Sequence, residues 1–285
     1  MKIVRPGNTE FNLLFAQFCE KNCKLSEDEN NEIKNIRKCY TDWIYKTAGY
    51  YDKEVPRKNK YEYPVDYTEK LSKFIDNMTL CLKNSTEVAA LGLDWMISRN
   101  TPLVKYVDQF KTYYNLNLRG GNFDARRTLP HILSKKVLVI SPFKELFDQQ
   151  MHNGNLLKIR PELSKSTFIT YKFPYTFLNN GPHQDCIETL EIIKDDIKNN
   201  YTDFDIAILS CGCYGSFLVD MICEEMKKDA IYVGGQLPLI FGIIGKRDKW
   251  AIKELYKNDT TYLTNGVPQE FRPDGWEKIE DGCYW

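Results

Sequence analysis

The second half of the chain alternates short apolar runs with amphipathic segments, and this alternation limits the possible folds more than any other feature. Residues 185–199 and 216–228 carry apolar side chains at helical spacing. Around them, four apolar runs are typical of buried strands: Val137–Ile140, Phe168–Tyr171, Ile206–Leu209 and Ile231–Val233. Strands that alternate with helices predict βα units feeding a parallel sheet. We therefore expect an α/β fold with a Rossmann-like parallel sheet flanked by helices.

The first half of the chain is mainly helical in pattern. Apolar residues at helical spacing predict helices over residues 10–21, 32–45 and 67–84. A short strand is expected at 88–93, and a loop rich in Lys, Tyr and Pro at 52–66. A chain of 285 residues is long enough for one large core. We expect a single domain over residues 1–285, with a helix-rich part at 1–135 and a Rossmann-like βα part at 136–285.

Charge and composition exclude several classes of function. The chain has 39 basic and 39 acidic residues, so it has no net charge to attract nucleic acid. Its longest apolar stretch, residues 237–244, is much shorter than the roughly 20 residues of a membrane span. Lys2, Arg5 and Pro6 lie where a secretory signal would be apolar. We expect a soluble cytoplasmic protein, in the host cytoplasm if the chain is viral.

Cysteine and histidine usage agrees with a reducing compartment. The nine cysteines are an odd number in a chain that is not small, and several occupy apolar patterns. Cys211 and Cys213 are too close for an ordinary zinc pair, and the chain has only three histidines. We therefore expect reduced thiols and no structural zinc.

Three loops should carry the chemistry, because ligands of open parallel sheets bind at the carboxyl ends of the strands. These loops follow Ile140, Leu209 and Val233, and each has an unusual composition. Their candidate donor-binding residues are Ser141, then Ser210, Cys211, Gly212, Cys213, Tyr214 and Gly215, and finally Gly234, Gly235 and Gln236.

The loop from Ser210 to Gly215 joins a strand to a helix. Such a junction offers backbone N–H groups and the positive helix end to a phosphate. Its Gly-x-x-Gly spacing is not the full dinucleotide fingerprint, so the two glycines could instead only shape a tight turn. Cys211 or Cys213 could be a nucleophile, although a small buried thiol explains either residue better.

Two further segments contain candidate charged groups. Lys246 and Arg247 follow two glycines, an arrangement suited to a diphosphate or to a solvated loop end. Near the N-terminus, a short strand runs through Arg5 and Gly7 into a helix that begins near Asn8 and Glu10. Glu10 could bind a divalent metal or accept a proton, but Asn8 and Glu10 also fit helix capping, and locally capping is the better explanation.

Taken together, these segments resemble a known family. Arg5-Pro-Gly-Asn-Thr-Glu10 resembles the Arg-x-Gly-Asp-x-Glu element of GT-D fold glycosyltransferases. The other matching segments are similar to those of GT-D-like proteins from bacterial polysaccharide loci and large DNA viruses: residues 136–143, 205–215, 230–236, 241–247 and 282–285. Asn8 stands where that family has the first carboxylate.

The resemblance implies a hexosyl- or deoxyhexosyltransferase that uses a nucleoside-diphosphate sugar, a glycan acceptor and either Mn²⁺ or Mg²⁺. Glu10 matches the family's second carboxylate and would be the catalytic base or the metal ligand. Asp94 and Asp185 are reserve catalytic carboxylates. Arg5, Gly7, Asn8, Lys246 and Arg247 join the loop residues above as candidate donor-binding residues.

Two other classes of function fit the same pattern. One is a non-catalytic protein that binds nucleotide sugars or glycans, which agrees with the amide at Asn8. The other is a nucleotide-dependent Rossmann oxidoreductase, which would require Gly-x-Gly-x-x-Gly and an acidic residue roughly 20 positions later. The loop at Gly212 lacks that spacing.

Overall fold

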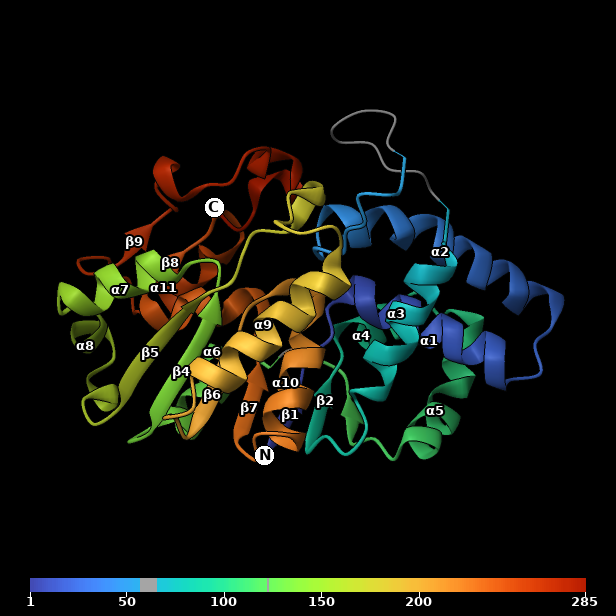
Figure 1. The fold of residues 1–285 in the computed structure, drawn as a ribbon, viewed down its shortest axis with the longest axis horizontal. Coiled ribbons are helices and arrows are strands. Elements are labelled where there is room, and N and C mark those ends of the chain that lie inside the picture. The colour runs from blue at the N-terminus through green and yellow to red at the C-terminus, as the bar shows by residue number, and fades with distance from the viewer. Residues whose placement is uncertain (57–65, 122) are drawn as a thin grey trace.

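The computed structural model, which describes residues 1–56, 66–121 and 123–285, contains a parallel sheet flanked by helices (Figure 1). In the described part of the chain this sheet has seven strands in the order β3-β2-β1-β7-β6-β4-β5, and every pair is parallel. The strands are β1 (Lys2–Val4), β2 (Glu87–Ala89), β3 (Leu118–Arg119), β4 (Lys136–Ser141), β5 (Thr167–Lys172), β6 (Ile206–Leu209) and β7 (Asp229–Tyr232). The predicted α/β fold is therefore confirmed.

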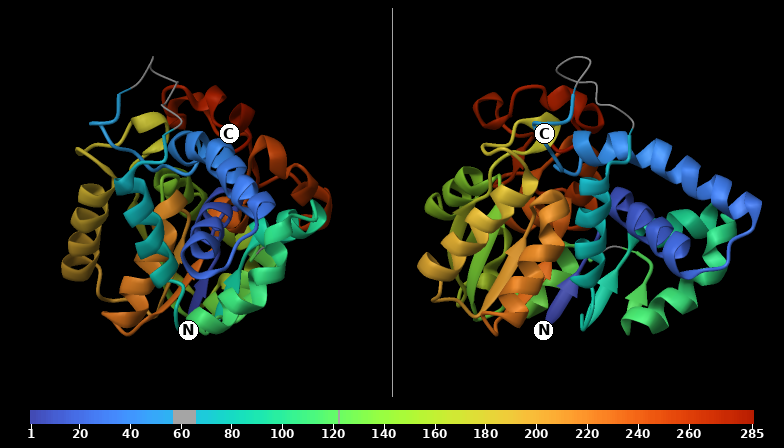
Figure 2. Two further views of the ribbon diagram at one scale, coloured as in Figure 1. Left: turned by 90° about the vertical axis from the view of Figure 1, so that its right-hand side faces the viewer. Right: turned by 45° about the vertical axis from the view of Figure 1, so that its right-hand side comes forward.

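Helices cover both faces of this sheet (Figure 2). The helices are α1 (Asn8–Asn22), α2 (Glu27–Lys46), α3 (Glu69–Leu80), α4 (Leu91–Ser98), α5 (Val107–Tyr114), α6 (Ala125–Ile132), α7 (Lys144–His152), α8 (Asn155–Ile159), α9 (Cys186–Asn200), α10 (Gly215–Glu224) and α11 (Trp250–Glu254). A second, two-stranded parallel sheet pairs β8 (Ile243–Ile244) with β9 (Thr264–Asn265). The mainly helical character of the N-terminal part is also confirmed.

The main sheet joins the two halves of the chain. β1 lies between β2 and β7, with Ile3 opposite both Glu87 and Ile231. Sequence periodicity placed β4, β5, β6 and β7 to within about two residues, but it did not predict β3, β8 or β9. It was also wrong for residues 91–93, which begin α4 instead of continuing β2. The predicted loop at 52–66 lies mostly outside the described residues.

Alternate residues of each strand point to opposite faces of the sheet and produce two cores. On β1, Val4 belongs to the core under α1, α3, α9 and α10, whereas Ile3 belongs to the core under α6, α7, α8 and α11. Both faces of the central strands are therefore apolar, as expected for a parallel sheet covered on both sides.

Neighbouring strands β1 and β7 send the chain to opposite faces. β1 leads into α1 on the first face, while β7 leads into the turn Gly234–Phe241 on the second. Such a divergence opens a crevice at the carboxyl ends of the two strands, and this is where parallel sheets bind ligands. The C-terminal segment, red in Figure 1, lies across this edge of the sheet.

Local signals explain where several helices begin. Ser26 and Glu29 form a reciprocal capping box at the start of α2. Asp185 caps α9 by accepting the N–H groups of Ile187 and Glu188, each at 2.8 Å. By contrast, α1 begins at Gly7 without a side-chain cap and is buried over residues 9–19. It is held mainly by the packing around it.

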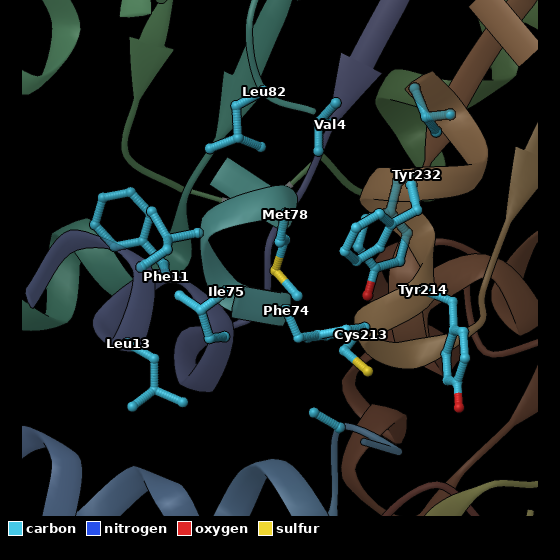
Figure 3. Close-up of a cluster of buried hydrophobic side chains, with 14 of the residues drawn as sticks. Val4, Phe11, Leu13, Phe74, Ile75, Met78, Leu82, Cys213, Tyr214 and Tyr232 are labelled. Carbon is cyan, nitrogen blue, oxygen red and sulfur yellow. The ribbon is translucent and has the colours of Figure 1, made fainter. Parts of the chain in front are cut away.

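The packing of α3 connects α1 to the sheet. Figure 3 shows Phe74 and Met78 of α3 between Phe11 of α1 and Cys213 of the loop after β6. Phe74 also packs against Phe217 of α10, with ring centroids 4.9 Å apart.

Among the described residues, no helix combines the length and the apolar character that a bilayer span requires.

Candidate functional site

A pocket of about 280 Å³ opens at the carboxyl edge of the main sheet, beside the β1–β7 crevice. Its walls come from the segments that follow β1, β4, β5, β6 and β7, together with the end of α2 and the C-terminal segment. The predicted site residues that line it are Arg5, Gly7, Asn8, Glu10, Ser210, Cys211, Gly212, Gly234, Gly235 and Arg247. Segments far apart in the sequence therefore meet here.

Two arginines approach consecutive glycines of the loop after β7. A Cβ added at Gly234 would collide with Nη1 of Arg5, and one added at Gly235 would collide with Nη2 of Arg247. Gly234 also has φ +68°, a left-handed conformation that favours glycine. The absence of side chains at these two positions therefore allows both guanidinium groups to reach the loop backbone inside the pocket.

Acidic and aromatic neighbours hold Arg247 in place. Its guanidinium carbon lies 3.9 Å from the ring centre of Tyr284, and its Nη1 lies 3.6 Å from Oε2 of Glu280. Its backbone N–H donates to the carbonyl of Cys283 at 3.1 Å. About a third of the side chain remains exposed (31%), so a ligand in the pocket can still reach it.

Glu10 lies in the pocket wall with only 5% of its surface exposed. Burial, with a smaller contribution from the negative charge of Glu280, raises the pKa of its carboxyl above the ordinary value. Hydrogen bonds from the N–H groups of Glu10 and Gly7 and the charge of Arg5 oppose this only in part. Gly7 is the N-cap of α1 and Glu10 is the third helical residue. Glu10 thus makes the backward hydrogen bond of a capping box and also faces the pocket.

The residues beside Glu10 do not form a metal-binding set. The side-chain amide of Asn12 donates to Oδ1 of Asn8 at 2.8 Å, and the amide of Asn8 donates to the hydroxyl of Tyr40 at 3.4 Å. Within residues 1–56, 66–121 and 123–285, no group of three or more His, Cys, Asp or Glu side chains is placed to hold a metal ion. Among the described residues, the protein therefore offers no three-ligand set for the Mn²⁺ or Mg²⁺ that the family resemblance implies, and the carboxylates lining the pocket are Glu10 and Glu280.

The glycine loop after β6 uses most of its N–H groups within the chain. The N–H of Cys213 donates to the carbonyl of Ala48 at 2.7 Å, and that of Gly215 donates to Gly212. The N–H of Tyr214 reaches the carbonyl of Cys211 at 3.3 Å. These three groups therefore do not point freely at a phosphate. Cys211 and Gly212 still line the pocket, whereas the buried Cys213 and Tyr214 do not.

The cysteine thiols of this loop are buried and protonated. Burial raises the pKa of both Cys211 and Cys213 well above the ordinary value. A thiol in this environment is a poor nucleophile, because the thiolate is the reactive form. All nine cysteines of the chain are free.

An aromatic wall lines the same pocket as the two arginines, and its Tyr284 stacks on Arg247. Trp285 is its centre, with ring centroids 6.5 Å from Tyr175, 6.3 Å from Phe177 and 5.7 Å from Tyr284. Phe143 packs against Tyr175 edge to face at 6.3 Å. All five side chains line the pocket. The pocket therefore offers both cationic and aromatic groups, which suits a ligand with both phosphate groups and a ring.

The two reserve carboxylates lie outside the pocket, and each holds local structure instead. Asp94 of α4 accepts the N–H of Gly121 at 2.6 Å. Asp185 caps α9 and pairs with Lys70 at 2.7 Å, while Lys70 also pairs with Asp52 at 2.9 Å. The structure therefore does not bring either of these carboxylates into the pocket with Glu10.

Four other candidate residues are also outside the pocket. Ser141 is fully buried, and its hydroxyl accepts the N–H of Phe143 at 3.2 Å. Gly215 packs against the ring of Tyr232. Gln236 belongs to the turn Gly234–Phe241 after β7 and does not line the pocket. Lys246 faces a neighbouring groove and donates to the carbonyl of Asp281 at 3.2 Å. The adjacent cations Lys246 and Arg247 therefore serve different surfaces.

Sequence reasoning missed several pocket residues. Tyr175 and Phe177 belong to Phe173-Pro-Tyr-Thr-Phe177, which follows β5 directly, so the rule applied to the other strands would have found them. Glu280 gave no signal in the sequence, and Trp285 entered only as part of the matching segment 282–285. Only the folded C-terminal segment brings both to the sheet edge.

Comparisons of the chain with protein-family models, with curated proteins and with solved structures found no match. The resemblance to GT-D glycosyltransferases therefore rests on the sequence motifs. Of what that resemblance implies, the parallel α/β fold is present.

Proposed function

We propose that this protein is a glycosyltransferase that moves a sugar from a nucleoside-diphosphate sugar to a glycan acceptor. The observation that carries the proposal is the convergence of Arg5 and Arg247 on Gly234 and Gly235, in the pocket that also holds Glu10. Paired guanidinium groups suit phosphate oxygens because they donate several charge-assisted hydrogen bonds in a fixed geometry.

The arginines and the aromatic residues of the pocket suit the two parts of such a donor. The diphosphate would lie against Arg5 and Arg247, and a ring of the donor would stack against the aromatic wall around Trp285. The place of the pocket, at the carboxyl ends of β1 and β7, is the usual one for nucleotide ligands of open parallel sheets.

In the transfer step, the bond between the anomeric carbon and the diphosphate breaks, and a bond to the acceptor oxygen forms. The departing diphosphate takes the negative charge, which the two guanidinium groups would stabilise. Glu10 would accept the proton of the acceptor hydroxyl. A carboxylate whose pKa is raised is a stronger base than an ordinary carboxylate, which suits this role.

A non-catalytic protein that binds nucleotide sugars is the second candidate. The favouring observation is that the carboxyl of Glu10 already accepts the N–H groups of Gly7 and Glu10, a structural role that needs no catalysis. The oxidoreductase has less support, because the N–H groups of Cys213 and Gly215 are engaged inside the protein.

Thermal-shift measurements with a panel of nucleotide sugars and NAD(H), followed by detection of released nucleoside diphosphate, test these alternatives. A glycosyltransferase should be stabilised by a nucleotide sugar, and Glu10→Gln should keep that binding but lose about a hundredfold or more in turnover. Asp94→Asn is the control, because Asp94 lies outside the pocket, and it should retain turnover.

Each of the other outcomes has a defined meaning. Stabilisation without turnover in the wild type, unchanged in Glu10→Gln, would identify the binding protein. Stabilisation by NAD(H) and by none of the nucleotide sugars would identify the oxidoreductase.

A further inference from the structure

The pocket contains two arginines whose guanidinium groups reach neighbouring residues of the loop after β7. Arg5 and Arg247 come from opposite ends of the chain, yet they reach consecutive residues, Gly234 and Gly235. Because both guanidinium groups lie against the same short stretch of backbone in one pocket, a ligand with two phosphoryl groups can contact both. Arginine stays protonated throughout the physiological pH range, so this charge is always present.

The carboxylates of the pocket are poorly arranged for a divalent cation. Glu10 is deeply buried, with only 5% of its surface exposed. Its carboxyl group is also held by the N–H groups of Glu10 and Gly7. The other carboxylate of the pocket, Glu280, lies 3.6 Å from the guanidinium of Arg247. A cation bound there would be repelled by that arginine.

We infer that this site binds a nucleoside diphosphate without a divalent metal, with Arg5 and Arg247 supplying the positive charge that a metal would otherwise provide. The inference rests on the proposed function and narrows it to a metal-independent donor site. Glu280 then acts as a counter-ion that holds Arg247 until the diphosphate takes its place.

Titration calorimetry of the full chain with uridine, adenosine, guanosine, cytidine and thymidine diphosphates tests this inference. Each titration is done in EDTA, in Mg²⁺ and in Mn²⁺. We expect at least one of these nucleotides to bind in EDTA with an affinity equal to or higher than that in either metal. Arg247→Gln should weaken this binding about tenfold or more, because it removes charge-assisted hydrogen bonds.

Lys249→Gln is the matched control, because it removes the same charge two residues away, outside the pocket. It should leave the affinity within about twofold of the wild-type value, as expected for an exposed charge. If Arg247→Gln does not fold, Glu280→Gln tests the same inference with the opposite sign. Removing a counter-ion should tighten binding in EDTA, whereas removing a metal ligand should weaken binding in Mg²⁺ or Mn²⁺.

Nucleotide binding that requires Mg²⁺ or Mn²⁺, or that weakens in Glu280→Gln, would overturn the metal-independent site and leave the glycosyltransferase proposal standing. If none of the five nucleotides binds in any of the three buffers, the donor site itself, and with it the proposed function, is wrong.

Discussion

The carboxyl group of Glu10 folds back over the backbone of Gly7, where an added Cβ would collide with its Oε2 atom. Gly7 is the N-cap residue of α1, so this contact closes the first turn of a helix that is buried along most of its length. The same carboxyl group faces the pocket at the carboxyl edge of the sheet. One residue therefore combines a structural role with the position of a reactive group.

Burial of Glu10 predicts a pH-dependent stability. The pKa of its carboxyl is raised above 4.5 in the folded protein, so between 4.5 and the folded value the folded state holds a proton that the unfolded state has lost. The free energy of unfolding should therefore fall as pH rises through this window, by at most about 1.4 kcal/mol per pH unit. Urea unfolding of wild type and Glu10→Gln across this range measures the effect.

Glu10→Gln should lose this part of the slope, because glutamine does not titrate, while Asp94→Asn should keep it. Equal slopes in wild type and Glu10→Gln would show that Glu10 has an ordinary pKa. They would also remove the reason for assigning it as a stronger base than an ordinary carboxylate.

Replacing Gly235 by alanine should weaken nucleotide binding. The added Cβ would meet Nη2 of Arg247 and the ring of Tyr284, so the guanidinium must move from its place in the pocket. We expect the dissociation constant for a nucleoside diphosphate to rise at least tenfold, about the value of one charge-assisted hydrogen bond. Titration calorimetry measures it.

A double-mutant cycle checks the cause. In an Arg247→Ala background, Gly235→Ala should cost much less binding, because the side chain that it displaces is already absent. Full additivity of the two losses would mean that Gly235 acts on the ligand by another route.

Asp185 should be a structural and not a catalytic residue. Burial opposes its ionisation, but hydrogen bonds from Lys70 and from the N–H groups of Glu188 and Ile187 outweigh it and hold the pKa of Asp185 below its ordinary value. Asp185→Ala should lose about 1–2 kcal/mol of stability, as for other N-cap losses. Asp185→Asn should lose less, because an amide oxygen still caps α9. Urea unfolding measures both, and nucleotide binding should be unchanged in both.

The contribution of the ionised Asp185 should disappear in acid. Its folded pKa lies below its unfolded value, so the stabilisation is complete above the unfolded pKa and is lost as pH falls toward the folded one. The stability difference between wild type and Asp185→Asn should shrink over that range. A difference that stays constant would contradict the ion pair with Lys70.

Gly212→Ala should destabilise the fold strongly. Gly212 has φ +54°, and its added Cβ would collide with the carbonyl oxygen of Ala48 at the end of α2. Gly154 has φ +69° with no atom within 4 Å of an added Cβ, so Gly154→Ala measures the cost of left-handed backbone alone. We expect about 1–2 kcal/mol for Gly154→Ala and a larger loss for Gly212→Ala, both from urea unfolding. Equal losses would mean that α2 moves aside freely.

The sequence by itself determined the local structure wherever the side-chain pattern repeats. The runs at Ile206–Leu209 and Val137–Ile140 became β6 and the centre of β4, because a strand buried on both faces must be apolar throughout. The stripe over residues 185–199 became α9, with Asp185 as its cap. Ligands of open parallel sheets bind at the carboxyl ends of the strands, and this rule selected the loops with Gly212 and Gly234. Both loops line the pocket.

Only the tertiary structure decided which charged groups share a site. Arg5 and Arg247 are far apart in the sequence, and they meet because β1 pairs with β7 in the sheet while the C-terminal segment folds across the same edge. Lys246 and Arg247 are adjacent in the sequence, but they face different surfaces. Periodicity reports which face of an element is buried. Which elements lie side by side depends on long-range strand pairing and packing, and local sequence patterns do not encode those contacts.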